Sequence, residues 1–154
     1  MTPGAIFLSV RPQYAEKILR GEKSVELRRV RPRLSPGDVV VMYVSSPQRE
    51  IKAFLLVEEV LEASPTDLWD LVGSRAGVTK SEYQDYFEGI DYGVGIVVSV
   101  AQNLKKPLSL DELRMVAPDF RPPQSFRYVD GLAAEIRVLL WSMWEGPACK
   151  LEVN

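Results

Sequence analysis

The chain has 154 residues, of which 46% are hydrophobic and 26% are charged. These values predict one globular domain with a sizeable core, and they exclude disordered, collagen-like and low-complexity chains. The net charge is only −2, yet residues 1–52 carry ten Lys and Arg against five Asp and Glu. The first third of the chain is therefore basic, as expected of a region that faces an anion.

Two residue types are scarce, and this narrows the possible chemistry. The sequence has no histidine, which excludes Ser-His-Asp and Cys-His catalysis and the usual catalytic zinc sites. The single cysteine, Cys149, can form neither an internal disulfide nor a metal cluster. We therefore expect no metal and no cofactor.

The hydropathy pattern argues against a membrane-spanning protein and against a signal peptide. No apolar run approaches the ~18 residues needed to cross a bilayer. The first residues lack the basic start and the long apolar stretch of a signal peptide. We expect no membrane partner and a cytoplasmic location.

A strand followed by a helix is predicted at the start of the chain. The apolar run 5–10 is typical of a buried strand. Pro12 fits the first turn of a helix, where its missing N–H costs nothing, and Tyr14 and Ile18 lie on the apolar face of that helix. Gly21 fits the left-handed cap that ends it.

Residues 23–30 alternate between apolar and charged side chains, which indicates a half-buried strand. Val25 and Leu27 point to one face, whereas Glu26 and Arg28 share the other. An ion pair between Glu26 and Arg28 would border a pocket, with Lys23 at the mouth of the strand.

The rest of the chain predicts further strands and short helices. Ser64, Thr79 and Ser109 each precede a helix as its N-cap, and Thr79 opens a capping box. The other expected segments are a turn at 34–38, strands at 39–44, 51–61 and 91–101, a proline-led loop at 121–128, and a helix at 131–145.

This element order predicts an α+β fold, namely a small closed or half-closed β-barrel decorated by short helices. We expect the barrel domain to span residues 1–128. Residues 129–154 would form a C-terminal helical extension packed on the same domain. The segment 138–144 is apolar on several faces, so we expect Leu140 and Trp144 to be buried. Either the tail 147–154 or a second subunit would cover the remaining apolar surface.

Several short motifs resemble the ASCH domains of the PUA-like superfamily, and the resemblance spans residues 5–128. They are Leu8-Ser9-Val10-Arg11-Pro12, Gly21-x-Lys23-x-x-Glu26-x-Arg28, Tyr43-x-Ser45-Ser46-Pro47 and Pro122-Pro123-Gln124-Ser125-Phe126. The resemblance implies a five- or six-stranded barrel with a cleft between the first helix and the strand 23–28. It also implies a ligand related to RNA or to modified nucleobases.

The chemistry of such a ligand indicates which residue types would bind it. Arginine binds phosphate through bidentate contacts, and an aromatic ring stacks on a splayed base. The candidate ligand-binding residues are Ser9, Arg11, Lys23, Arg28, Arg29, Tyr43, Ser45, Ser125, Phe126 and Arg127.

Three hypotheses follow. The first is an RNA- or nucleotide-binding module with little or no catalysis. The second is a hydrolase, acting on RNA or a modified nucleoside, that uses Lys23 and Glu26 as an acid–base pair. ASCH amidohydrolases carry a nucleophilic threonine where this chain has Glu26, which argues against that particular reaction. The third is an interaction domain that dimerises through its C-terminal helix, so the sequence leaves monomer and homodimer open.

Overall fold

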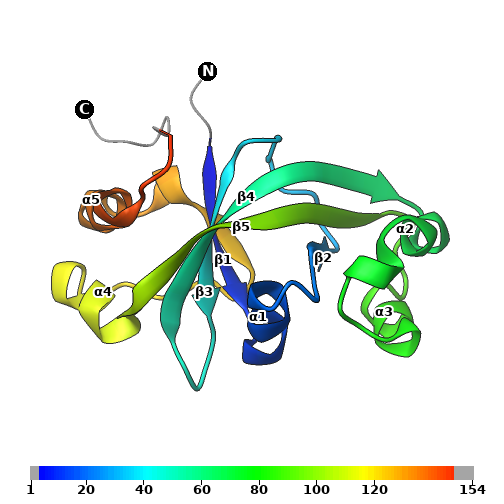
Figure 1. The fold of residues 1–154 in the computed structure, drawn as a ribbon, viewed down its shortest axis with the longest axis horizontal. Helices are drawn as coiled ribbons and strands as arrows, with labels where there is room; N and C mark the ends of the chain where they lie inside the picture. The colour runs from blue at the N-terminus through cyan, green and yellow to red at the C-terminus, as the bar shows by residue number, and fades with distance from the viewer. Residues whose placement is uncertain (1–3, 148–154) are drawn as a thin grey trace.

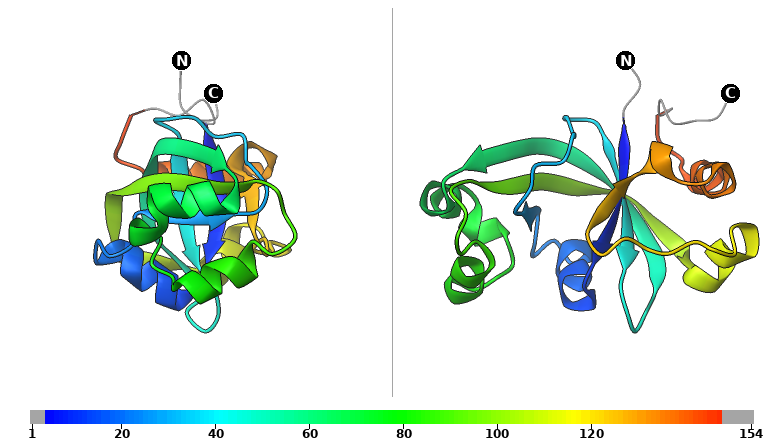
Figure 2. Two further views of the ribbon diagram at one scale, coloured as in Figure 1. Left: turned by 90° about the vertical axis from the view of Figure 1, so that its right-hand side faces the viewer. Right: turned by 180° about the vertical axis from the view of Figure 1, so that it is seen from behind.

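The computed structural model describes residues 4–147. Its centre is one six-stranded sheet with the strand order β2-β5-β4-β3-β1-β6, curled into an open half-barrel (Figure 1; Figure 2, left). This confirms the predicted α+β barrel-like fold. The strands are β1 (Ala5–Val10), β2 (Val25–Arg28), β3 (Val39–Val44), β4 (Glu50–Ala63), β5 (Gly93–Ser109) and β6 (Phe126–Tyr128).

The strands nearest the middle of the sheet are the most apolar ones. Every residue of β3 is buried, as expected of a β-branched run covered on both faces. Strand β1 pairs with β3 in parallel, and the other neighbours in the sheet are antiparallel. Strands β4 and β5 are longer than the sequence predicted, and together they extend as a curved arm, along whose far end the short β2 pairs with β5 (Figure 1).

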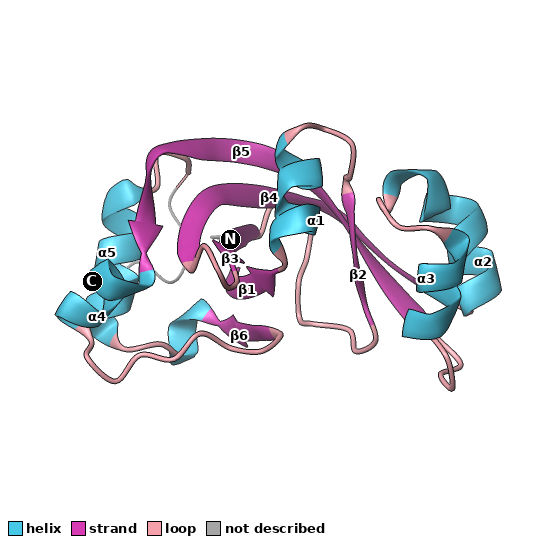
Figure 3. Ribbon diagram, turned by 90° about the horizontal axis from the view of Figure 1, so that it is seen from below, coloured by secondary structure: helices cyan, strands magenta, loops and turns pink. Residues whose placement is uncertain are grey.

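Five α-helices cover the sheet at three places (Figure 3). The helix α1 lies near the middle, α2 and α3 lie at the end of the β4–β5 arm, and α4 and α5 lie at the opposite end. Ser64, Thr79 and Ser109 cap α2, α3 and α4 as predicted, and Thr79 forms a complete capping box with Glu82. The helices are α1 (Pro12–Leu19), α2 (Pro65–Val72), α3 (Lys80–Tyr86), α4 (Leu110–Val116) and α5 (Ala134–Met143).

Three apolar clusters hold these layers together. The largest lies under α4 and α5 and is centred on Phe7, Phe54 and Ile136. A second fills the other side of the sheet beneath α1. A third joins β2 to α2 and α3. Because α5 contributes fully buried side chains to the largest cluster, it packs against the same sheet as the rest of the chain.

The C-terminal helix differs from the prediction at one tryptophan. Leu140 is fully buried as expected, but Trp144 is only half-buried, and the side chain covered by the sheet is Trp141. The reason is the direction of α5, which stacks Trp141 against Phe54 with ring centroids 6.5 Å apart. The helix ends at Met143, and the ring of Trp144 packs on the edge of the same cluster, 5.3 Å from Phe54 between ring centroids, where it is only partly covered. The expected covering strand at 147–154, with Cys149, falls almost entirely outside the described residues.

The loop 121–128 also differs, because its last residues form β6 and pair with β1. Across residues 4–147, no helix is long and apolar enough to span a membrane.

Candidate functional site

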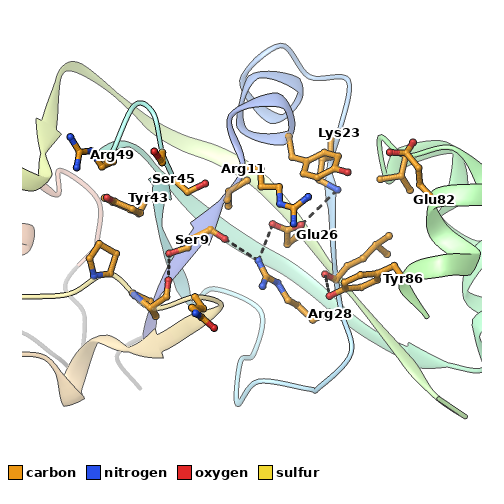
Figure 4. A pocket seen from close by; sticks show the side chains of 18 of the residues that line it. Ser9, Arg11, Lys23, Glu26, Arg28, Tyr43, Ser45, Arg49, Glu82 and Tyr86 are labelled. Atoms are coloured by element: carbon orange, nitrogen blue, oxygen red, sulfur yellow. Dashed lines mark hydrogen bonds and ion pairs between the residues drawn. The ribbon is translucent and has the colours of Figure 1, made fainter. Parts of the chain in front are cut away.

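A cavity of about 710 Å³, here called the central cleft, opens between α1, β2, α3 and the start of α4. The ends of β1 and β3 form its floor, and the loop 122–124 closes one side (Figure 4). This volume is within the range of small-molecule sites in proteins. The strand β2 and the pair β1–β3 meet here although the sheet order separates them.

Three charged side chains from one short segment line the wall of the cleft formed by β2, here called the β2 wall. Glu26 lies between two cations, with its Oε1 3.7 Å from Lys23 Nζ and its Oε2 3.4 Å from a terminal nitrogen of Arg28. Glu26 and Arg28 share a face because they are two residues apart in a strand. The carboxylate therefore neutralises part of the charge of both neighbours.

Lys23 is the most deeply buried of the three, with only 3% of its surface exposed. Its ammonium donates a 2.5 Å hydrogen bond to the carbonyl oxygen of Ala76 and lies 5.4 Å from the centre of the Tyr14 ring. Burial lowers the pKa of Lys23 from its usual value of 10.5, and the charges of Arg28 and Lys17 lower it further, whereas Glu26 opposes the shift. Lys23 therefore loses its proton at a lower pH than a lysine in water does.

Arg28 connects the two ends of the curled sheet. One terminal nitrogen donates to Ser125 Oγ at 2.9 Å, and the other donates to the backbone oxygen of Ser9 at 3.3 Å. Ser9 in turn donates through Oγ to the carbonyl oxygen of Pro123 at 2.6 Å. The planar guanidinium suits this role because its donors form a rigid fork.

The opposite wall of the cleft carries a second group of cations. Arg49 follows the turn after β3, and Arg114 comes from α4. Both lie close to Tyr43, whose side chain is almost wholly buried and whose hydroxyl has no hydrogen-bond partner within residues 4–147. Burial raises the pKa of Tyr43, and the positive charges of Arg49 and Arg114 oppose that rise. Ser45 lies beside them (Figure 4).

Aromatic rings line the end of the cleft nearest α3. Tyr86 is 39% exposed, and its hydroxyl donates to the backbone oxygen of Leu27 at 3.1 Å. Tyr14 lies against Lys23, and Tyr83 is buried with its hydroxyl bonded to the carbonyl oxygen of Pro65. Tyr86 therefore offers the accessible ring face in this part of the cleft.

The cleft brings together most of the residues selected from the sequence. The residues that line it are Ser9, Arg11, Lys23, Glu26, Arg28, Tyr43 and Ser45.

Four other selected residues, Arg29, Ser125, Phe126 and Arg127, are not part of its lining. Arg29 turns to the backbone oxygens of Tyr86 and Glu88, and Arg127 donates to the backbone oxygen of Gly131. Phe126 packs edge-on against Tyr128 and into the core beneath α1, because β6 turns this ring toward the sheet. Ser125 contacts two lining residues, since its hydroxyl accepts from Arg28 and its backbone oxygen accepts from the amide of Ser9 at 2.9 Å.

Sequence reasoning missed four important lining residues, Arg49, Arg114, Glu82 and Tyr86. Arg49 carried a possible signal, since it follows the Tyr-x-Ser-Ser-Pro motif by two residues. The other three had none, because only the tertiary fold brings α3 and α4 to β2 and β3.

The acidic residues of the cleft give no indication of a metal site. Within the described range 4–147, no three Cys, Asp or Glu side chains gather closely enough to hold an ion. Glu26 already contacts two cations. The arrangement instead offers an amine with a lowered pKa, an arginine fork and exposed aromatic surface, which together suit an anionic ligand that carries a planar ring.

The fold is an open half-barrel with a cleft where the ends of its curled sheet meet, and comparison with known proteins identifies the family. The family model of the ASCH domain matches residues 8–107. The chain therefore belongs to the ASCH domain family, as the motif resemblance predicted.

Individual relatives agree with this assignment. The chain is 29% identical over 122 residues to a protein of Zymomonas mobilis named as an ASCH domain-containing ribonuclease, an alignment that covers 79% of this chain and 82% of that one. The crystal structure of ASCH from Zymomonas mobilis superposes with a TM-score of 0.80 at 28% identity, covering 90% of this chain and 94% of that chain. A protein of Pseudomonas putida shares the fold, with a TM-score of 0.56 at 16% identity, over 90% of this chain and 98% of its own.

Proposed function

We propose that this chain binds single-stranded RNA in the central cleft and cleaves it. The observation that carries the proposal is the buried Lys23, whose pKa is lowered, next to Glu26 and Arg28 on the β2 wall of an open cleft. The relative from Zymomonas mobilis named as a ribonuclease aligns with 79% of this chain, which supports the same substrate class.

Single-stranded RNA fits the cleft better than a duplex. A duplex hides its bases inside the helix, whereas a single strand can turn one base outward to stack on an aromatic side chain. Tyr86 supplies an exposed ring in the cleft, and Arg11, Arg28 and Arg49 supply charges that attract the phosphate backbone.

The chemistry proposed for this site uses the ribose 2′-hydroxyl as nucleophile. Neutral Lys23 takes the 2′ proton through its lone pair, while one N–H donates to Ala76 and the carboxylate of Glu26, 3.7 Å away, stabilises the ammonium that forms. The 2′ oxygen forms a bond to phosphorus, the bond to the 5′ oxygen breaks, and that oxygen takes a proton from solvent water. The products are a 2′,3′-cyclic phosphate and a 5′-hydroxyl.

Arg28 stabilises the charge that builds on the phosphate during this step. A guanidinium aimed at the developing charge in a partly dry site is worth more than the same contact in water. Glu26 holds both Lys23 and Arg28 and so acts as a positioning residue.

The decisive experiment follows the cleavage of an end-labelled single-stranded RNA. We expect the wild type to cleave it, the Lys23→Met variant to lose at least about a hundredfold in rate, and Lys52→Met, which changes a lysine outside the cleft, to keep the wild-type rate. An oligonucleotide with 2′-O-methyl groups should bind to all three proteins and be cut by none. Wild-type binding without cleavage would reject the transesterification step and leave a binding protein, and absence of both would overturn the proposal.

Binding has its own test at Arg28. Replacing it by alanine should weaken the binding of the 2′-O-methyl oligonucleotide by about 1–3 kcal/mol, and this loss should shrink as salt is added. Arg127→Ala is the matched control, since Arg127 is exposed and lies outside the cleft lining. Equal losses in the two variants would show that the contact is not in the cleft.

A further inference from the structure

We infer that the two ends of the central cleft bind different parts of the ligand, with a phosphate at the Arg49–Arg114 end and the base at the Tyr86 end. The ligand is then a nucleotide and not a free nucleoside. This inference rests on the proposed function of the cleft and adds the orientation of the ligand within it.

The charges along the cleft are unevenly placed. Arg49, Ser45 and Tyr43 gather at one side in Figure 4, whereas Glu82 and Tyr86 lie at the other. Glu26 and Glu82 are the two carboxylates among the described lining residues, and neither belongs to the Arg49 side. An anionic phosphate is therefore favoured at the Arg49 end and disfavoured near Glu82.

Donors at the Arg49 end remain available for a ligand. The guanidinium of Arg49 makes no hydrogen bond or ion pair with any residue between 4 and 147, and Arg114 uses only its Nε, which donates to the carbonyl oxygen of Phe120 at 3.1 Å. The hydroxyls of Ser45 and Tyr43 also donate to none of these residues. By contrast, the ammonium of Lys23 and the two terminal nitrogens of Arg28 already have protein acceptors, whereas the buried Nε of Arg28 has none among the described residues.

The backbone holds Arg49 in place although its side chain is free. Arg49 has a φ of +50°, a left-handed conformation that is uncommon for a residue with a side chain. Its carbonyl oxygen accepts a 2.9 Å hydrogen bond from the amide of Leu110, the first residue of α4. This bond ties the turn that carries Arg49 to the helix that carries Arg114, so the two guanidinium groups are kept on the same wall.

The opposite end suits a base. Tyr86 presents its ring there, and Glu82, one carboxylate oxygen of which accepts from the amide of Thr79, keeps the other oxygen for the exocyclic amino group of adenine, cytosine or guanine. A free nucleoside would fill this end and leave the donors of Arg49, Ser45 and Tyr43 without an acceptor. The same cleft would therefore discriminate against a modified nucleoside that lacks a phosphate.

The test compares adenosine with adenosine 3′-monophosphate and 5′-monophosphate by calorimetric titration of the wild-type protein. We expect one monophosphate to bind at least about tenfold more tightly than adenosine, because charge-assisted hydrogen bonds to the phosphate are added. Inorganic phosphate should compete with the monophosphate and leave adenosine binding unchanged.

Variants then locate the phosphate. Arg49→Gln should remove about tenfold of the affinity for the monophosphate and leave the affinity for adenosine as it was. Arg31→Gln is the control, because Arg31 is an exposed arginine of the same basic third outside the cleft lining. Arg49 is exposed, so we expect its variant to fold.

The outcomes separate this inference from the proposed function. If adenosine binds as tightly as both monophosphates, or if Arg49→Gln behaves as Arg31→Gln does, the orientation is wrong. RNA binding that depends on Arg28 would then still stand. If neither the monophosphates nor RNA bind, both proposals fail together.

Discussion

The two walls of the central cleft carry positive charge in opposite ways. On the β2 wall, Lys23 and Arg28 are mostly buried and share the carboxylate of Glu26. On the facing wall, Arg49 and Arg114 are exposed and almost unpartnered. Buried charges need partners because desolvation is costly, whereas exposed charges keep their donors for a ligand. The comparison assigns structural support, proton transfer and the phosphate contact of Arg28 to the first wall, and it leaves the free donors of the second wall for a ligand.

Removal of the shared carboxylate should have the largest effect on stability. Glu26→Ala leaves Lys23 buried without its counter-charge, so we expect the free energy of unfolding to fall by about 3 kcal/mol. Urea denaturation measures this change, and Glu22→Ala, at an exposed position three residues from β2, is the control. A loss below ~1 kcal/mol would show that the buried pair is not needed to hold the β2 wall.

Replacement of Arg28, the arginine fork on the same wall, should have the second-largest effect on stability. Arg28→Lys keeps the charge but cannot span Ser125, Ser9 and Glu26 at once, so we expect a loss of about 1–2 kcal/mol in the free energy of unfolding. Arg127→Lys, at an exposed site outside the cleft lining, should change it very little. Identical denaturation midpoints for the two variants would contradict the role given to the fork.

Titration of Lys23 makes the free energy of unfolding depend on pH, and the lowered pKa fixes the sign of that dependence. Burial lowers the pKa of Lys23 in the folded state below 10.5, so between that lowered pKa and 10.5 the unfolded chain binds more protons. The free energy of unfolding attributable to Lys23 therefore rises with pH in this window, by at most about 1.4 kcal/mol per pH unit. Denaturation of wild type and Lys23→Met across this range isolates the contribution, and a difference that falls with pH would reverse the assignment.

A substitution on the facing wall should change the stability of the protein very little. Arg49→Gln removes a side chain that contacts no described residue through hydrogen bonds or ion pairs, so we expect the free energy of unfolding to change by less than about 0.5 kcal/mol. Thermal denaturation is sufficient to check this. A larger loss would mean that Arg49 serves the fold, and the contrast between the walls would disappear.

Local patterns were sufficient to predict the β2 wall. Alternation placed Glu26 and Arg28 on one face, and Lys23 precedes Glu26 by three positions, so the whole cluster lies within one short segment. The caps of α2, α3 and α4 were predicted for the same reason, since a cap depends on residues only three apart.

The facing wall could not be predicted because its residues are far apart in the chain. Arg49 and Arg114 meet only when the β3–β4 turn packs on α4, and Tyr86 reaches the cleft only because β4 and β5 carry α3 across it. Phe126 shows the converse, since an aromatic residue in a polar loop predicts exposure until β6 pairs with β1 and turns the ring inward.

The gap between β2 and β6, the two outermost strands of the sheet, determines how the width of the barrel opening can be changed. These strands stand at opposite ends of the sheet order, so the gap between them is bridged by the side chain of Arg28 and not by a ladder of main-chain hydrogen bonds. A ladder fixes strand spacing at about 4.8 Å, whereas a side-chain bridge changes with the residue that makes it. Substitutions at Arg28 and Ser125 should thus widen or narrow the entrance, so that larger or smaller ligands fit. The pairing of the strands in the sheet should stay the same.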